Sequence, residues 1–248
     1  MRGERGDDRN EQRGGSLLVV PENALIIVPI RNTVLFPGMI LPLTIGRESS
    51  ILAAQQAVKT DRPVGILLQR DAEVEQPTLQ DLYRVGTVAN ILRYVTLPDN
   101  THVIVCQGLQ RFRVSGFLPG YPFPVTHPER IDEPETTDSQ IEARMIRVRE
   151  RALELLQYLP QASQELVGAV KSITQPGALA DLVAGVSELK LPDRQLVLET
   201  IDLTQRLDVV LACLLSRLEV LRLSREVDER TKASIDQRQR EYLLREQM

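Results

Sequence analysis

The chain of 248 residues has no tryptophan, and only 4% of its residues are aromatic. A hydrophobic core must therefore be built from leucine, valine and isoleucine. Cysteine and histidine are also scarce, with two of each. Because Cys106 and Cys213 each lie in an apolar run, we expect two buried free thiols in a reducing compartment, rather than a disulfide or a catalytic thiol.

The motifs of common catalytic and metal sites are missing. His102 and His127 have no cysteine or second histidine nearby at ligand spacing, so no metal site is predicted. The sequence has no G-x-x-x-x-G-K-[ST] phosphate loop, no G-x-S-x-G elbow and no H-E-x-x-H helix. We expect no catalytic residue, cofactor or metal in this chain, a pattern more typical of a binding and assembly unit than of an enzyme.

Charge and hydropathy restrict the partners and the location. The net charge of −4 counts against a general nucleic-acid binder, whose affinity comes from a basic surface. No run approaches the ~18 apolar residues of a membrane span. Residues 1–15 mix arginines with acids and have no apolar centre, so they are not a signal or transit peptide. We expect a cytoplasmic chain with no membrane partner and a disordered tail over residues 1–20.

Short apolar runs broken by proline and glycine fill residues 24–125 and favour a small sheet or partly closed barrel. Pro42 places its strand at an edge or a bulge. The sequence LPDNT predicts the turn of a hairpin. One helix is expected, with Ile51, Ala54 and Val58 on its apolar face. The expected strands are 24–30, 39–45, 64–69, 85–97 and 102–109, with weaker candidates at 111–114 and 122–126, and the helix is 47–59.

Beyond the polar, proline-containing segment 128–139, the apolar period becomes helical. Ser139 and Glu142 form a capping-box pattern, and apolar residues then recur every three or four positions until Pro160. Further helices are expected at 163–173, at 177–186 and from Asp193, as an N-cap, to about residue 201.

The last helix is expected to begin near Asp202 and to run to Met248, a length of about 68 Å. Its first half has one apolar side. Beyond Leu223, acids precede bases by four residues, which supports a solvated helix that projects toward another domain or subunit. Because no glycine, asparagine or proline ends this helix, we expect the protein to continue past Met248.

Three stretches resemble the N-terminal region of the Lon family of ATP-dependent proteases. They are VPIRNTVLFPGMILPLTIGRESS (28–50), DLYRVGTVANILRYVTLPDNTHVIVCQGLQRFRV (81–114) and QRQREYLLREQM (237–248). Ile30 stands where the family usually has leucine, Leu243 where it has a second tyrosine, and Asn100 where it has glycine. Asparagine also tolerates positive φ, so the turn at Asn100 is retained. The resemblance covers about residues 24–248.

The resemblance implies an α+β fold of two domains, namely a PUA-like β domain and a helical bundle that ends in a long projecting helix. The expected divisions are a β domain at 21–130, a linker at 131–138, a bundle at 139–230 and the long helix at 203–248. The resemblance also implies a parent hexamer with an AAA+ ATPase, which uses ATP and Mg, and a Ser–Lys protease, both beyond Met248. The expected partners are unfolded or degron-bearing proteins.

Under this hypothesis, Pro37 and Gly38 suit the centre of a type II turn. Phe36, Met39 and Ile40 flank the turn and, if exposed, would form an apolar patch that holds unfolded segments. The alternative is that they fill the barrel core.

Further candidate substrate contacts are Arg31, Tyr83 and Tyr94, for which solvation or sheet-face packing are the alternatives. Candidates for assembly and coupling on the last helix are Glu226, Arg230, Arg240, Tyr242 and Arg245. Two other functions stay open, a stand-alone ligand-binding or adaptor module with the same fold, and RNA binding.

Overall fold

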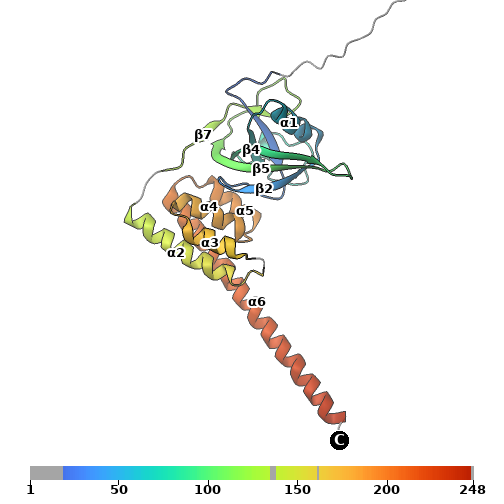
Figure 1. Cartoon of the computed structure of the whole chain (residues 1–248), viewed down its shortest axis with the longest axis vertical. Coiled ribbons are helices and arrows are strands. Elements are labelled where there is room, and N and C mark those ends of the chain that lie inside the picture. Colours follow the sequence, from blue (N-terminus) through green and yellow to red (C-terminus); the bar gives the residue numbers. More distant parts are fainter. Residues whose placement is uncertain (1–18, 135–137, 161, 247–248) are drawn as a thin grey trace, which may run out of the picture.

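A computed structural model of the chain describes residues 19–134, 138–160 and 162–246, with side chains described as far as residue 232. A β domain (β1–β7 with α1) and a helical domain (α2–α6) lie one after the other, and α6 extends far beyond the second (Figure 1). The α+β fold expected from the sequence is confirmed. The elements are β1 (Leu25–Ile30), β2 (Ile40–Ile45), α1 (Glu48–Lys59), β3 (Val64–Leu68), η1 (Leu79–Asp81), β4 (Val85–Thr96), β5 (His102–Arg113), β6 (Val125–Thr126), β7 (Glu129–Ile131), α2 (Ser139–Leu156), α3 (Gln164–Ser172), α4 (Pro176–Val186), α5 (Leu191–Glu199) and α6 (Leu203–Glu246).

The sheet is mixed and has two ends. Its strand order is β2-β5-β4-β3-β1-β6, with β7 paired to β5. β1 and β3 run parallel, and the other pairs are antiparallel. β2 pairs with β5 at one end of this order, which confirms the edge position expected from Pro42. The two ends of this order, β2 and β6, do not pair with each other, and we call the region between them the seam.

The predicted turns form as expected. The Met39 amide donates to the Phe36 carbonyl (3.2 Å), and Gly38 has φ +78, which gives the type II turn centred on Pro37 and Gly38. Asn100 has φ +62 in the hairpin turn between β4 and β5. Gly108 lies against the Phe36 carbonyl so closely that any side chain there would collide with backbone.

In the β domain, two sequence expectations are wrong. Of the three residues expected on the apolar face of α1, Ala54 is buried and Ile51 packs against the core, but Val58 is 48% exposed, and the buried face is completed by Ser50, Ala53 and Ala57. Small residues face the sheet because the helix packs closely on it. The separate strand expected at 111–114 is the continuation of β5, which pairs there with β7.

Two helix starts also differ from expectation. The N-cap of α2 is Asp138, whose carboxylate accepts from the Ile141 amide (2.8 Å), and Ser139 is the first helical residue. α5 begins at Leu191 after Lys190, so Asp193 lies within the first turn instead of capping it. In that turn its charge still complements the helix dipole.

Val20, in the expected tail, is buried, and its carbonyl accepts a hydrogen bond from Arg62 (2.7 Å).

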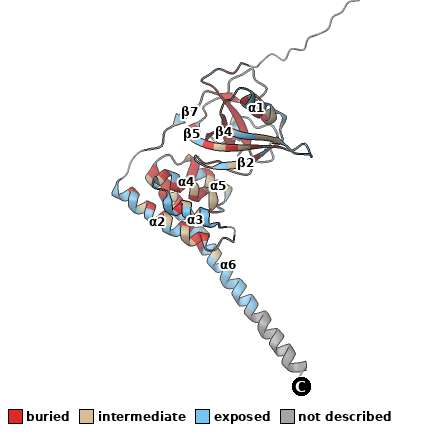
Figure 2. Ribbon diagram, in the orientation of Figure 1, coloured by how far each residue is buried: buried red, intermediate tan, exposed pale blue. Residues whose placement is uncertain are grey.

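The helical domain packs against the β domain through one continuous apolar cluster. Val34, Phe36, Leu68 and Val85 of the β domain share this cluster with buried residues of α2, α4 and α6. The Gln195 amide of α5 also donates to the Val85 carbonyl (3.0 Å). Buried residues accordingly line the facing sides of both domains, whereas the described far part of α6 is exposed (Figure 2).

Four charged residues from separate segments meet beside this apolar contact, and we call them the inter-domain charge cluster. They are Arg111 of β5, Glu133 after β7, Asp181 of α4 and Arg206 of α6. Arg111 donates to both carboxylate oxygens of Asp181 (2.8 and 2.5 Å) and to the Leu198 carbonyl (3.0 Å). Glu133 accepts from both arginines, at 3.3 Å from Arg111 and 2.6 Å from Arg206.

Three of the four members of the cluster are buried, Glu133 is 45% exposed, and the charges balance. Arg111 is 1% exposed, Arg206 0% and Asp181 2%. Burial raises the pKa of the Asp181 carboxyl, and the guanidinium groups of Arg111 and Arg206 oppose that rise. Arg206 also donates hydrogen bonds to the carbonyls of Thr200 (2.8 Å) and Ile201 (2.9 Å). Buried charges are tolerated only when they are paired and hydrogen-bonded in this way.

We predict that Asp181→Asn destabilises the chain by about 3 kcal/mol, because it leaves a net positive charge buried between two arginines. Urea unfolding followed by circular dichroism would measure the loss. The matched control is Asp208→Asn, since Asp208 is 54% exposed in its ion pair with Arg144, and that change is expected to cost less than about 1 kcal/mol. Equal losses in the two variants would contradict a special role for the cluster.

Candidate functional site

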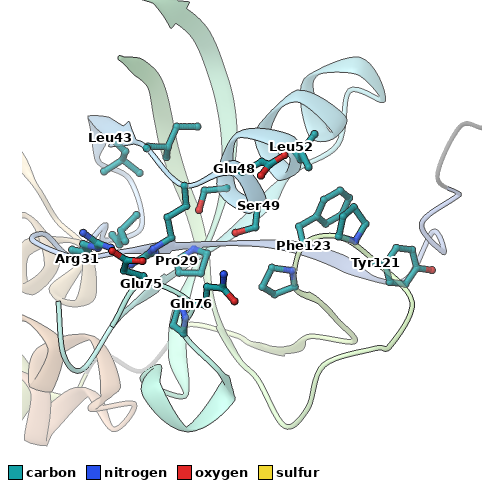
Figure 3. Close-up of a pocket in the computed structure, with 18 of the residues that line it drawn as sticks. Pro29, Arg31, Leu43, Glu48, Ser49, Leu52, Glu75, Gln76, Tyr121 and Phe123 are labelled. Carbon is teal, nitrogen blue, oxygen red and sulfur yellow. The ribbon is translucent and has the colours of Figure 1, made fainter. Parts of the chain in front are cut away.

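A groove of about 1310 Å³ opens at the seam between the two ends of the sheet (Figure 3). Its walls are the end of β1, most of β2, the first turn of α1 and the loops 75–77 and 117–124. Many lining residues are aliphatic, aromatic or proline, among them Pro29, Leu43 and Phe123. Pockets for small molecules usually hold ~300–1,000 Å³, so this groove has room for a larger ligand.

The edge of β1 is open along this groove. β6 pairs only with Leu25 and Ile26, whereas β3 pairs with β1 as far as Ile30. The Ile27 amide donates to the Pro124 carbonyl (2.9 Å) on the β6 side, so Pro29, two residues further on, has its backbone on that same side. Proline has no N–H to donate, and this protects the edge against pairing with another strand.

Arg47 organises one end of the groove. Its guanidinium donates to the side-chain oxygen of Gln69 and to the Val74 carbonyl (3.3 Å). Gln69 is buried and donates to the same Val74 carbonyl (2.6 Å), so the two side chains fix the loop that lines the groove. Burial and the neighbouring charge of Arg31 lower the pKa of the Arg47 guanidinium.

Two polar atoms at this end have no hydrogen-bond partner within the described part of the chain. They are Nε of Arg47 and the hydroxyl of Ser50, which is 2% exposed. Both residues line the groove.

The structure does not bring the sequence-predicted contact residues into one exposed patch. Phe36 is fully buried in the apolar cluster that joins the two domains, and Met39 and Tyr83 pack against that apolar cluster. The sulfur of Met39 lies against Gly185 of α4, where a Cβ would require the methionine side chain to move. The Tyr83 ring also lies under the guanidinium of Arg70, with 4.4 Å from that carbon to the ring centroid. The exposed-patch hypothesis is therefore wrong for Phe36, because the helical domain covers it.

The other predicted contacts lie nearer the surface but apart from one another. Arg31 is exposed at the groove, Pro37 is half-buried, and Ile40 is 54% exposed. The Tyr94 hydroxyl lies 2.8 Å from Nδ1 of His102 and accepts a hydrogen bond from the side-chain amide of Gln55 (3.4 Å). These partners support packing at the hairpin for Tyr94.

A second apolar surface crosses β2, β5 and β4, and we call it the outer face. In β2, Leu43 and Ile45 point into the core, so Ile40, Pro42 and Thr44 point outward. The register places Val105 opposite Pro42, Val103 opposite Thr44 and Val95 opposite Val103, on the same side of the sheet. The outer face thus carries the apolar residues Ile40, Pro42, Val95, Val103 and Val105, all exposed or half-buried, and between them the polar residues Thr44, Arg93 and Gln107. The sequence analysis missed the valines, although period-2 alternation marks them.

On α6, Arg230 donates to Glu226 (2.6 Å), a pair at i,i+4 with both side chains largely exposed. The side chains of Arg240, Tyr242 and Arg245 lie outside the described residues. No group of three or more histidine, cysteine, aspartate or glutamate residues in the described part of the chain is placed to hold a metal ion. Among the described helices, none is long and apolar enough to cross a membrane.

The comparisons with known proteins agree with this geometry. Residues 24–216 match the family described as the ATP-dependent protease La (LON) substrate-binding domain. The chain is 48% identical over 239 residues to a Lon protease of Phenylobacterium zucineum (strain HLK1), covering 96% of the chain and 30% of that protein. It is 46% identical to a Lon protease of Paraburkholderia phytofirmans (strain DSM 17436 / LMG 22146 / PsJN), covering 94% of the chain and 29% of that protein.

Solved structures show the same fold. The N-terminal domain of the Mycobacterium avium complex Lon protease aligns with a TM-score of 0.63 and 25% identity, over 77% of this chain and 97% of that one. The Lon N-terminal domain protein from Xanthomonas campestris aligns at 0.54 and 19% identity, over 76% of this chain and 97% of that one. The chain belongs to the family of Lon substrate-binding domains, as the resemblance implied. It spans about 30% of the length of the curated relatives named here.

Thiol chemistry has no support at either cysteine. Burial raises the pKa of the Cys106 thiol to about 12, and burial likewise raises the pKa of the half-buried Cys213 thiol. We predict that iodoacetamide at pH 8 leaves Cys106 of the folded chain unmodified and alkylates it only in denaturant, because the thiolate is the reactive form. Mass spectrometry of tryptic peptides would report both sites. Rapid alkylation of Cys106 in the folded chain would contradict its placement in the core.

Proposed function

We propose that this chain is the non-catalytic substrate-recognition and assembly region of an ATP-dependent Lon-type serine protease that degrades misfolded and regulatory proteins. The match to the substrate-binding domain family over residues 24–216 carries the proposal. Its ligands are unfolded or degron-bearing proteins, and the parent protein works as a cytoplasmic hexamer that uses ATP and Mg. In this proposal the ATPase and the Ser–Lys protease lie outside this chain, which spans about 30% of the length of the curated relatives.

The outer face is the surface we assign to unfolded segments. It carries exposed or half-buried apolar residues on three neighbouring strands, interspersed with polar ones, and exposed apolar residues that gather on one surface commonly mark partner sites. Val103 and Val105 are short and β-branched, so this surface is stiff and offers no pocket for one particular side chain. Such a surface binds many sequences weakly. Six copies in a ring would gain affinity because one flexible substrate engages several of them.

A role in assembly and coupling for α6 follows from where it begins and where it goes. Arg206, in its first turn, belongs to the inter-domain charge cluster, and Leu207, Val210, Leu214 and Leu218 are buried in the helical core. Beyond these residues the described side chains are mostly exposed and include the Glu226–Arg230 pair. In this proposal the solvated part of the helix connects substrate capture to the motor.

The alternatives have less support. A stand-alone ligand-binding or adaptor module would have no use for a long exposed helix, and the curated relatives named here are proteases. RNA binding would require a basic surface, whereas the chain carries a net charge of −4.

We predict that Ile40→Ser combined with Val105→Thr weakens binding of a reduced, alkylated unfolded protein by roughly tenfold, because two apolar contacts are lost. Fluorescence anisotropy of the labelled unfolded protein would measure it. The control is Val220→Ser with Leu223→Ser on α6, two residues that are 53% and 55% exposed, and no change in affinity is expected there. An equal loss of affinity in both variants would indicate non-specific hydrophobic binding and would contradict the assignment to the outer face.

We also predict that the 248-residue chain alone hydrolyses neither ATP nor casein. Phosphate release and the loss of fluorescence-labelled casein would be followed with the chain in excess over any trace contaminant. Tight binding of ATP, measured by calorimetry, would contradict the proposal that the nucleotide site lies outside this chain.

A further inference from the structure

The chain enters the β domain at one wall of the seam groove. Arg62, just before β3, donates hydrogen bonds to four backbone carbonyls between residues 20 and 24, at 2.6 to 3.1 Å. The Tyr121 hydroxyl donates to the Val19 carbonyl (3.3 Å), and Tyr121 lines the groove. Residues 1–18 precede the described part of the chain, and the point from which they start is therefore fixed beside the groove.

The groove wall at this point is apolar. The loop 117–124 contributes Phe117, Tyr121 and Phe123, and the rings of the last two stack with 6.3 Å between their centroids (Figure 3). Leu52 of α1 also lines the groove and is 37% exposed. An apolar occupant is favoured here because its burial removes both surfaces from water.

Two leucines directly precede the anchored residue. Leu17 and Leu18 lead into Val19 in the sequence SLLVV, and successive Cα atoms are only ~3.8 Å apart, so both side chains start within reach of the groove. A fully extended segment of 18 residues reaches about 60 Å, twice the ~30 Å diameter of a small domain, so the whole groove is within its range. A ligand joined to its site by a short linker also has an effective concentration in the millimolar range, which a free peptide of equal affinity would have to match.

The charges of the groove and of the segment are mixed in the same way. Residues 2–13 contain four arginines and four acids. The groove is lined by two arginines and two glutamates, namely Arg31, Arg47, Glu48 and Glu75. A polyanion such as a nucleic-acid backbone would be repelled by both glutamates, whereas a segment that carries both signs can pair with either kind of residue. Pro29 lacks an N–H at the open edge of β1, so such a segment is held by side-chain contacts instead of a continuous strand ladder.

We propose that residues 1–18 are an intramolecular ligand of the seam groove, with Leu17 and Leu18 packed against Phe117, Tyr121 and Leu52. In this arrangement the segment covers the groove and excludes other polypeptides from it until it is displaced. The site is separate from the outer face, and its occupation by this segment does not depend on the proposed function.

Photo-cross-linking of the 248-residue chain tests where the segment lies. The substitution Leu17→p-benzoylphenylalanine supplies the cross-linker, and mass spectrometry of tryptic peptides identifies its partners. We expect cross-links to residues 42–52, in addition to those with the loop 117–124 that the attachment of Val19 would produce by itself. Cross-links confined to that loop, or directed to the outer face, would overturn the proposal. Mixing normal and ¹⁵N-labelled chains detects cross-links between two molecules, which would place a second copy in the groove and overturn it equally.

A labelled peptide of residues 8–19 measures whether the groove is already occupied. In fluorescence anisotropy, the chain with Leu17→Ser and Leu18→Ser should bind this peptide about tenfold more tightly than the unchanged chain, because its own segment no longer competes. The peptide with the same two serines should bind neither chain. Equal binding of the original peptide to both chains, or binding to neither, would contradict the proposal.

Two substitutions on α1 form a matched pair for this measurement. Leu52 and Val58 are 37% and 48% exposed on the same helix, but of the two only Leu52 is among the described lining residues of the groove. In the chain with the two serines, Leu52→Glu should weaken binding of the peptide by about tenfold, because an apolar contact is replaced by a charge. Val58→Glu should leave the affinity unchanged. Equal effects of the two substitutions would place the peptide outside the groove.

Discussion

Arg111 is a permanent cation that β5 carries into the contact between two domains, where water does not reach it. Its neighbours are fixed by that requirement. Asp181 of α4 accepts two of its hydrogen bonds, the Leu198 carbonyl accepts a third, and Glu133 links it to Arg206 of α6. Gly177, in the first turn of α4, has no side chain because Glu133 occupies that space. These residues come from four separate segments of the chain, and they meet around one buried guanidinium.

Such a cluster does more to select one arrangement than to add stability. Apolar residues of similar volume would often be as stable, but the loss of any one partner leaves a charge in a medium that cannot solvate it. The domains therefore have one orientation that satisfies all four charges, beside an apolar contact that would tolerate small shifts. Phe36 and Met39 belong to this arrangement, so the turn at Pro37 and Gly38 serves the joint between the domains.

Local patterns in the sequence predicted most of the local structure, although the N-caps of α2 and α5 were placed on the wrong residues. Period-3.6 spacing predicted α2 and α6, and the turn residues predicted the positive φ of Gly38 and Asn100. Errors arose where tertiary contacts decide. Val58 was placed on the inner face of α1 because it is apolar, but the close packing of that helix admits only alanine and serine there. Nothing local to Phe36 shows that α4 covers it.

The groove and the outer face were beyond sequence reasoning for a related reason. The groove has lining residues from five segments between Pro29 and Pro124, and only the strand order reveals that they meet at a seam. The outer face depends on register, which pairs Pro42 with Val105 across a bulged sheet. Alternation in β5 alone predicts which valines share a face, but not which residues of β2 lie beside them.

The length of α6 has a mechanical meaning. Its 44 residues correspond to about 66 Å of helix, of which about 40 Å lies beyond Leu218, the last buried residue among those whose side chains are described. The buried segment fixes one end of the helix in the bundle. The three hydrogen bonds that the Arg206 guanidinium donates to Glu133, Thr200 and Ile201 resist rotation of the helix about its own axis. A push at the far end therefore arrives as a bending moment and a twist at the joint between the two domains. A helix that ended at Leu218 would fold the same bundle, yet it would have no arm through which such a load could act.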